Sequence, residues 1–347
     1  FGFFKICLYR SLVDNAEHGA LDALARHIRD GVGYQDFHSD GEQVRLRCTI
    51  GHATLDHGFA DAGAVLAATE DATREARNST IGIAGYTPTE VAAAGSIADT
   101  MRIALEGDGA ALHLAFQPVV AVAGGEEAQY QVLLRMRQPD GSLLPASQVI
   151  PAAELAGGIA QIDHWVLEHA LFVLAERQAQ GPSLRLFVSQ SPRSLARESH
   201  AQWLLDALRA RGIEGTSLVI DLRLADALIH TVTLRQFCQQ LMPAGVQFCL
   251  SQFEPGAEAD ALLTQLPLGF VRVSSKYASA HADMQLRDQL RGIIDNAHRQ
   301  GLVVIGQQIE DPQAAAAMWM GGVDFIQGNL VQAVGSELGF DFHNAVL

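Results

Sequence analysis

Phe116-Gln117-Pro118-Val119-Val120 and Gln131-Val132-Leu133-Leu134-Arg135-Met136 are two mainly apolar runs, separated by a Gly-Gly-Glu-Glu turn at 124–127. Short aliphatic runs bounded by glycine-containing turns are typical of β-strands. The segment therefore predicts two successive strands, with Gln117 and Arg135 toward their ends.

The chain after this segment alternates between strand-like and helix-like patterns. Apolar runs that predict strands occur at 184–189, 217–222, 246–252, 270–273, 302–305 and 325–326. Helical periodicity occurs at 164–177, 201–211, 232–241, 284–300 and 312–320. Repeated strand and helix units favour an α/β fold with a parallel sheet, and this many units favour a closed barrel.

Residues 1–88 predict a smaller domain that precedes the barrel. Its expected elements are a strand at 3–9, a helix at 15–30, a hairpin around Asp40-Gly41, a strand at 44–52 and a helix at 62–77. The strand at 44–52 alternates apolar residues with Arg45, Arg47 and Thr49, which predicts one buried face. Residues 89–110 predict a connecting helix, because apolar residues recur there at helical spacing. The barrel is expected at 111–347.

The composition limits the classes of function. The chain has 347 residues, of which 48% are hydrophobic, so it can bury a barrel core and that of a smaller domain. A net charge of −15 opposes nonspecific binding to nucleic acids or acidic lipids, and no apolar run is long enough for membrane insertion. Cysteines at 7, 48, 238 and 249 lack metal or disulfide spacing, which favours the cytoplasm. The chain begins at Phe1 rather than Met, so we expect a fragment of a longer protein.

Several motifs resemble those of the EAL family of cyclic-di-GMP phosphodiesterases. They follow the family's order: Gln-Pro at 117–118, Arg at 135, Leu-Pro at 144–145, Val-Ile-Pro-Ala-Ala-Glu at 149–154, Ile-Asp-His-Trp-Val at 162–166, Gln-Gln-Ile-Glu at 307–310 and Gln-Gly at 327–328. The resemblance covers residues 111–335. It implies a modified TIM (β/α)8 barrel that binds cyclic-di-GMP.

The sequence departs from the family where active members hold two metal ions. The corresponding residues here are Gln131, Ser189, Asp221, Ser251, Gln252, Arg272 and Gln307. Only Asp221 carries a carboxylate, whereas two-metal hydrolysis needs several fixed carboxylate oxygens. The departures therefore imply no metal, no catalytic residues and no enzymatic hydrolysis.

The same resemblance assigns ligand contacts to residues at the retained motif positions. These are Gln117, Pro118, Leu133, Leu134, Arg135, Met136, Asp163, Glu310, Gln327 and Gly328. Arg135 could meet a ligand phosphate while Leu133 and Leu134 line a purine or ribose, or it could pair with an acid of the barrel. No further cofactor is expected, and binding is expected to be independent of metal.

The other polar positions have structural alternatives. Asp163 could cap the helix that begins at His164, accept from a base edge, or do both. Glu310 could accept from guanine N–H groups or be a solvated acid. Gln117 could bond to sugar, phosphate or backbone, and the Gln-Gly pair at 327–328 could form only a turn.

Residues 1–88 resemble the later part of a GGDEF diguanylate cyclase domain, through a strand at 46–53 and a helix at 64–77. The Gly-Gly-Asp-Glu-Phe motif is absent from this sequence, so the resemblance implies a degenerate domain unless the motif lies upstream. A degenerate pair of this kind resembles the FimX family of type IV pilus regulators. That resemblance implies a cyclic-di-GMP receptor with a PilZ-type adaptor and a second copy of itself as partners. It also implies a polar position in the cell and roles in twitching motility and biofilms.

Two other functions remain open from the sequence. A slow phosphodiesterase could use Asp221, Glu254 and Glu310 in a rearranged site. An interaction scaffold could keep the fold without any ligand. The missing acids oppose the first alternative, and the retained Gln117, Arg135 and Glu310 oppose the second.

Overall fold

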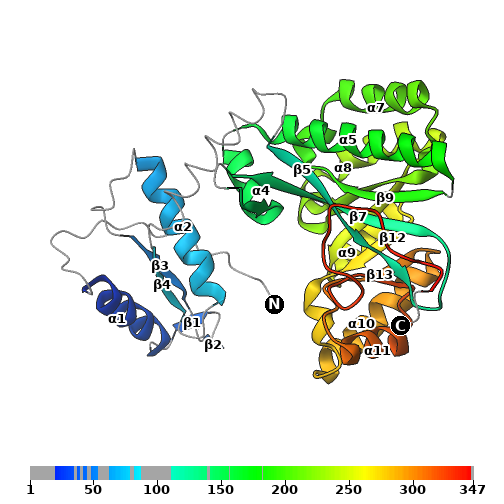
Figure 1. The fold of residues 1–347 in the computed structure, drawn as a ribbon. Coiled ribbons are helices and arrows are strands. Elements are labelled where there is room, and N and C mark those ends of the chain that lie inside the picture. The colour runs from blue at the N-terminus through cyan, green and yellow to red at the C-terminus, as the bar shows by residue number, and fades with distance from the viewer. Residues whose placement is uncertain are drawn as a thin grey trace. The chain divides into compact units, whose positions relative to one another are not determined.

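The computed structural model describes residues 20–34, 37–39, 42–44, 48–53, 62–78, 82–86, 111–138, 141–155, 157–181 and 183–344. The chain forms two compact units, Phe1–Ala93 and Ala94–Leu347 (Figure 1). Among the described helices, none is long and apolar enough to cross a bilayer.

The first unit combines short strand pairs with two helices. Its described elements are α1 (Ala20–Tyr34), β1 (Phe37–Ser39), β2 (Glu42–Val44), β3 (Ile50–His52), α2 (Ala62–Asn78) and β4 (Ile83–Gly85). β1 and β2 pair antiparallel, whereas β3 and β4 pair in parallel with α2 as their connection. Gly51 of β3 approaches Thr73 of α2 so closely that a side chain would collide with the helix backbone.

The predicted helices of this unit are found as α1 and α2, and the pairing of β1 with β2 confirms the hairpin. The single strand predicted at 44–52 is wrong, because its two ends belong to different two-stranded sheets. The predicted strand at 3–9 and the connecting helix at 89–110 lie outside the described residues.

A sheet of ten strands forms the second unit and is nearly closed into a barrel. Its order is β5-β7-β9-β10-β11-β12-β13-β14-β6, with β8 beside β7. The strands are β5 (Leu112–Pro118), β6 (Val120–Ala121), β7 (Ala128–Arg137), β8 (Leu143–Pro145), β9 (Leu184–Ser189), β10 (Leu218–Arg223), β11 (Gln247–Phe253), β12 (Phe270–Val273), β13 (Val303–Gly306) and β14 (Phe325–Ile326). β5 and β6 are consecutive in the chain, so one segment borders both ends of the sheet and brings it close to closure.

The strands β7 and β9 to β14 run parallel to one another, as the sequence predicts. The beginning of the sheet departs from this parallel pairing. β5 and β8 are antiparallel to β7, and β6 is antiparallel to β14. Because the loop at 122–127 is short, the chain can return only in the opposite direction, and a parallel neighbour would need a long crossover.

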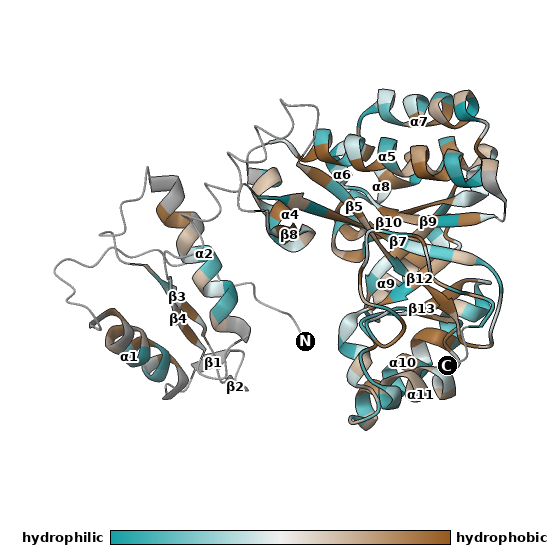
Figure 2. Cartoon of the chain, viewed as in Figure 1, coloured by the Kyte–Doolittle hydropathy of each residue, from teal (hydrophilic) through white to brown (hydrophobic). Residues whose placement is uncertain are grey.

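Helices follow most of the parallel strands and cover the outside of the sheet. They are α4 (Ala146–Leu155), α5 (Ile159–Gln180), α6 (Pro192–Leu195), α7 (Glu198–Arg211), α8 (Leu224–Leu241), α9 (Ala257–Gln265), α10 (Met284–Arg299) and α11 (Pro312–Gly321), with 3₁₀ turns at Gly215–Ser217, Met242–Ala244 and Ser275–Ser279. Hydrophilic and hydrophobic residues mix along these helices (Figure 2), as expected for helices with one face on a core. The sequence patterns do not predict α9, whose apolar face spans only about two turns.

Apolar side chains form two layers, one on each face of the sheet. A small inner cluster consists of Val119, Phe187, Val219, Cys249, Phe270 and Ile305. The main core, between the sheet and the helices, contains the alternate strand residues such as Leu186, Ile220 and Leu222. Successive strand residues face opposite sides, so residues an even number of positions from the inner cluster face the barrel interior.

Candidate functional site

Polar side chains lie on the inner face of the sheet, toward the carboxyl ends of the strands. On β7, Gln131, Leu133 and Arg135 share one face and alternate with core residues. Asp221 of β10 and Arg272 of β12 each lie two residues beyond a member of the inner cluster. In (β/α) barrels this end of the strands carries ligand sites. We therefore treat it as the candidate site.

Asp221 and Arg272 form a buried ion pair inside the barrel. Arg272 Nη1 donates to Asp221 Oδ2 over 2.6 Å, and the two side chains are 5% and 1% exposed. The guanidinium carbon lies 5.2 Å from the centre of the Phe187 ring. The pair spans β11, which separates the two strands. Its positive member neutralises the carboxylate that the sequence retains at a metal position.

Several polar atoms in this part of the barrel are buried without a hydrogen-bond partner. They are Asp221 Oδ1, Arg272 Nε, Arg272 Nη2 and Gln131 Oε1. Gln131 Nε2 lies 3.5 Å from Ser189 Oγ, at the limit of hydrogen bonding. Because native proteins leave few buried polar atoms unpaired, these atoms mark a place where water or a ligand could bind.

The residues at the positions expected to be degenerate metal sites do not fit a pair of divalent cations. In the described part of the chain, no group of three or more His, Cys, Asp and Glu side chains could hold a metal ion. Ser251 donates to the backbone oxygen of Leu222, and Gln307 donates to that of Val273. Asp221 supplies one carboxylate, already paired, where Mg²⁺ or Mn²⁺ would need several oxygen ligands.

Two glutamines at strand ends have left-handed backbone conformations. Gln252 in β11 has a φ of 55°, and Gln308 just after β13 has a φ of 56°. The pairing of β11 with β12 shifts register between Leu250 and Phe253, which leaves Gln252 exposed. Residues other than glycine seldom adopt these angles, and such strain concentrates at functional sites.

Gln117 and Gln327 link the first strand of the barrel to the loop after the last. Gln327 Nε2 donates to Gln117 Oε1 over 2.9 Å, and Gln117 Nε2 donates to the backbone oxygen of Gln332 over 3.2 Å. Both glutamines and the adjacent Pro118 are buried. The hydrogen bonds thus fit the structural alternative for Gln117, an amide that satisfies the backbone at a strand end.

Gly328 permits close approach of two backbone segments after β13 and β14. A Cβ at this position would lie 2.1 Å from the carbonyl oxygen of Ile309. Ile309 N donates to the oxygen of Gln327, and Leu330 N donates to the oxygen of Ile309. The Gln-Gly pair therefore forms a tight turn, as the structural alternative predicts.

Arg135 is half-buried near the end of β7. Its Nη1 donates to the backbone oxygen of Leu134 over 2.9 Å, and burial lowers the pKa of Arg135 from its ordinary value. No carboxylate among the described residues lies within ion-pairing distance of it. The expected alternative, a pair with a barrel acid, is therefore not found in this part of the chain, and N–H groups remain for an anion.

The three apolar residues of the β7 motif divide between the two faces of the strand. Leu133 is half-buried on the face of Arg135. Leu134 and Met136 are 4% and 0% exposed and belong to the main core. The expectation that Leu134 and Met136 contact the ligand is therefore wrong, because the two-residue period of a strand turns them away from the barrel interior.

Asp163 lies inside α5, four residues after the helix begins at Ile159. The prediction that it caps a helix starting at His164 is therefore wrong. Its Oδ2 accepts hydrogen bonds from Ser191 N, Ser191 Oγ and Ser194 Oγ, at 2.9, 2.5 and 2.6 Å. Burial raises the pKa of Asp163, although these bonds oppose the shift. The carboxylate holds the loop between β9 and α6.

The two other acids considered for the site differ in their surroundings. Glu310 is exposed after β13, and its carboxylate has no partner among the described residues. Glu254 pairs with Lys276 over 2.6 Å, and hydrogen bonds from Lys276 and Ser274 lower the pKa of Glu254 against the effect of burial. Glu310 therefore remains available to a ligand, and Glu254 is already engaged.

Sequence reasoning missed the loop after β9. Gln190, Ser191 and Ser194 connect the barrel end to α5 through Asp163, and Gln190 Nε2 also donates to the backbone oxygen of Ser189. The run Ser-Gln-Ser-Pro-Arg-Ser at 189–194 directly follows a buried strand. Polar residues at that point are the signal that could have identified it.

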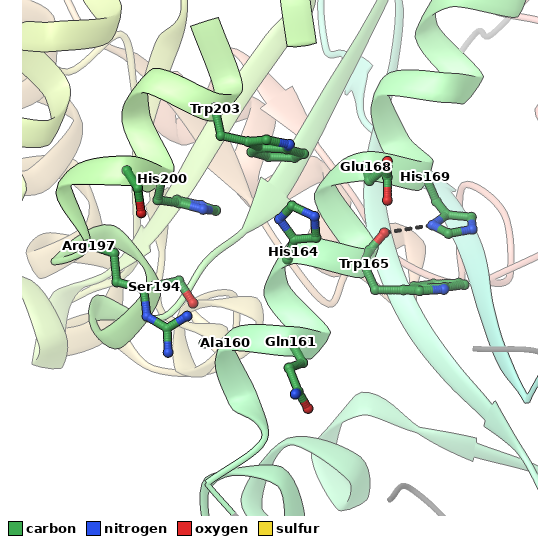
Figure 3. A pocket seen from close by; sticks show the side chains of 11 residues that line it. Ala160, Gln161, His164, Trp165, Glu168, His169, Ser194, Arg197, His200 and Trp203 are labelled. Carbon is green, nitrogen blue, oxygen red and sulfur yellow. Dashed lines mark hydrogen bonds between the residues drawn. The ribbon is translucent and has the colours of Figure 1, made fainter. Parts of the chain in front are cut away.

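A separate pocket of about 680 Å³ lies between α5 and the α6–α7 segment (Figure 3). Trp203 lies over His164, with ring centres 4.2 Å apart. Burial lowers the pKa of His200 to about 4, helped by His164 and Arg197. His200 Nε2 lies 3.2 Å from Gln190 Oε1. The pocket thus adjoins the loop after β9, although its lining is separate from the polar residues inside the barrel.

Comparisons with known proteins identify the barrel. The EAL domain family model matches residues 98–333. The FimX EAL domain of Pseudomonas aeruginosa, solved with c-di-GMP bound, is 29% identical and has a TM-score of 0.66. That match covers 71% of this chain and 99% of the solved one.

Two curated relatives are similar over a smaller share of their own length. The cyclic di-GMP phosphodiesterase NbdA of P. aeruginosa is 29% identical over 67% of this chain and 30% of its own. The cyclic di-GMP phosphodiesterase PdeR of Escherichia coli is 24% identical over 92% of this chain and 48% of its own. The chain therefore spans less than half the length of either relative.

Proposed function

Because the chain belongs to the EAL domain family, we propose that its barrel is a cyclic-di-GMP receptor that does not hydrolyse its ligand. The observation that carries this proposal is the buried pair of Asp221 and Arg272. At the positions where active members hold metal ions, the one retained acid is bound to the guanidinium of Arg272, which occupies another of these positions, and the remaining positions carry amides or hydroxyls. Such a barrel lacks the ligands that two-metal hydrolysis requires.

The proposed ligand contacts lie around the carboxyl ends of the strands. Arg135 has N–H groups for a phosphate, and Leu133 on the same face offers an apolar contact for ribose or base. The unpartnered carboxylate of Glu310 could accept from guanine N–H groups. The FimX EAL domain with c-di-GMP bound supports this ligand class, since it matches most of the second unit.

A weak phosphodiesterase is the second candidate, favoured by the similarity to NbdA. It would need Asp221, Glu254 and Glu310 to gather metal ions. Arg272 and Lys276 already neutralise the first two of these acids, which opposes this function.

The proposed output is signalling through protein partners in the cytoplasm. The resemblance to FimX suggests a PilZ-type adaptor, a homodimer and control of type IV pili from a cell pole. These roles rest on the resemblance and on the 29% identity to the FimX EAL domain.

Calorimetric titration with cyclic-di-GMP, with and without EDTA, tests binding. We expect the same dissociation constant in both, because no metal takes part in the proposed contacts. Chromatography of the nucleotide after incubation with Mg²⁺ or Mn²⁺ tests hydrolysis. Loss of binding in EDTA, or linear dinucleotide above a no-protein control, contradicts the receptor proposal.

A further inference from the structure

We infer that Arg272 is a built-in cation that serves the ligand's phosphodiester groups in place of a metal ion. This inference rests on the proposed function and concerns how the same site attracts its ligand. Cyclic-di-GMP carries two phosphodiester charges, whereas this chain has a net charge of −15. The barrel therefore needs local positive charge near its ligand.

The position of Arg272 supports this role. Its side chain lies inside the barrel, paired with Asp221 and placed over the Phe187 ring. Asp221 compensates the charge of the guanidinium, so Arg272 would act on an anion through the donor nitrogens that Asp221 leaves unused, and such charge-assisted hydrogen bonds are strong in a low-dielectric place. A divalent cation would bind Asp221 poorly, since it would have to displace the guanidinium of Arg272 from this carboxylate.

The hydrogen bonding of the pair is incomplete in a way that points to a ligand. One of the possible bonds to Asp221 is formed, and Arg272 Nε and Nη2 are buried without acceptors. Gln131 Oε1 and Asp221 Oδ1 are unpartnered as well. Burying an ion pair costs desolvation energy, which a purely structural pair would offset with bidentate geometry. These two donor nitrogens instead remain for a phosphate oxygen or for a water that bridges to it.

The inference predicts that positive charge at residue 272, rather than the intact pair, determines affinity. Asp221→Asn keeps the guanidinium and removes its neutralising partner, so binding should be at least as tight as in the wild type. Asp221→Asn combined with Arg272→Met removes both charges and the donors. The double variant should fold, because a buried ion pair can often be replaced by neutral side chains, and it should bind about tenfold more weakly or worse.

The test is calorimetric titration of each protein with cyclic-di-GMP in EDTA, with circular dichroism and thermal melting to verify the fold. Arg209→Met is the matched control, because Arg209 pairs with Asp206 on the surface of α7. If the double variant does not fold, Asp221→Asn with Arg272→Gln replaces it and keeps a hydrogen-bonded pair.

The outcomes separate this inference from the proposed function. If the wild type does not bind, the receptor proposal fails. If the wild type binds and the folded double variant binds equally well, the receptor proposal stands and the inference is overturned. Weaker binding by Asp221→Asn also overturns the inference, since ligand affinity would then depend on the intact ion pair and not on the positive charge at residue 272.

Discussion

At the scale of single residues, Arg135 is a charged side chain with spare N–H groups and no acid partner among the described residues. We predict that Arg135→Ala weakens cyclic-di-GMP binding by about one to two decades, since a charge-assisted hydrogen bond contributes about 1.5 to 3 kcal/mol. Calorimetric titration measures the change, and an unaltered melting curve verifies the fold. Arg299→Ala, an exposed change at the end of α10, is the control. An unchanged dissociation constant for Arg135→Ala would assign the residue a structural role.

Residue positions in the site were predictable where a local rule applied. The alternation of a strand puts Gln131, Leu133 and Arg135 on one face, and applying it strictly would have excluded Leu134 and Met136. The pair of Asp221 and Arg272 could not be predicted in this way. Its members are 51 residues apart, and the order of the strands in the sheet brings them together across β11.

At the scale of elements, the turn at Gly328 fixes the segments that follow β13 and β14. We predict that Gly328→Ala lowers the free energy of unfolding by about 2 kcal/mol or more, because its Cβ would collide with the backbone of Ile309. Chemical denaturation measures the change. Gly292→Ala inside α10 is the opposite case: nothing lies near its Cβ, so stability should rise by about 0.5 to 1 kcal/mol. Equal effects of the two substitutions would contradict the close approach at Gly328.

The packing of α7 against the loop after β9 should make stability depend on pH through His200. Burial lowers the pKa of His200 to about 4 in the folded state, whereas the pKa of an unfolded histidine is about 6.5. As pH falls through this window, the unfolded state gains a proton that the folded state does not, so the free energy of unfolding decreases. We predict that the melting temperature of the wild type falls more steeply between about pH 7 and about pH 4.5 than that of His200→Gln. Parallel curves would show that His200 is protonated equally in both states.

Most elements of the barrel were predictable because each is short, apolar and bounded by polar turns. The wrong predictions concern the segments that connect strands and helices. The helical pattern predicts a start of α5 at His164, although the glycines at 157 and 158 mark an earlier beginning at Ile159. The antiparallel start of the sheet follows from the short loop after β6, whose length was visible in the sequence.

At the scale of the whole molecule, binding and hydrolysis make different demands on the fold. Binding needs a few donors and apolar surfaces at one end of the sheet, and in the proposed receptor Arg135, Leu133 and Arg272 would supply them. Hydrolysis needs acids on several strands at once. The expected GGDEF-like identity of the first unit stays a prediction, and the proposed hydrolytic inactivity concerns the barrel alone.

Because hydrolysis needs acids on several strands at once, restoring a single acid should not restore it. Gln131→Glu restores the acid that names the family, but we expect it to produce no cyclic-di-GMP hydrolysis. Ser189, Ser251, Gln252 and Gln307 would still stand in place of metal ligands, and Arg272 would still neutralise Asp221. Groups that act as a unit do not recover additively when one member returns. Chromatography of the nucleotide after incubation with Mn²⁺ provides the measurement, and calorimetry in parallel verifies that the variant still binds. Linear dinucleotide formed by the variant would mean that one carboxylate suffices to gather the metal ions, and the phosphodiesterase alternative would then replace the receptor.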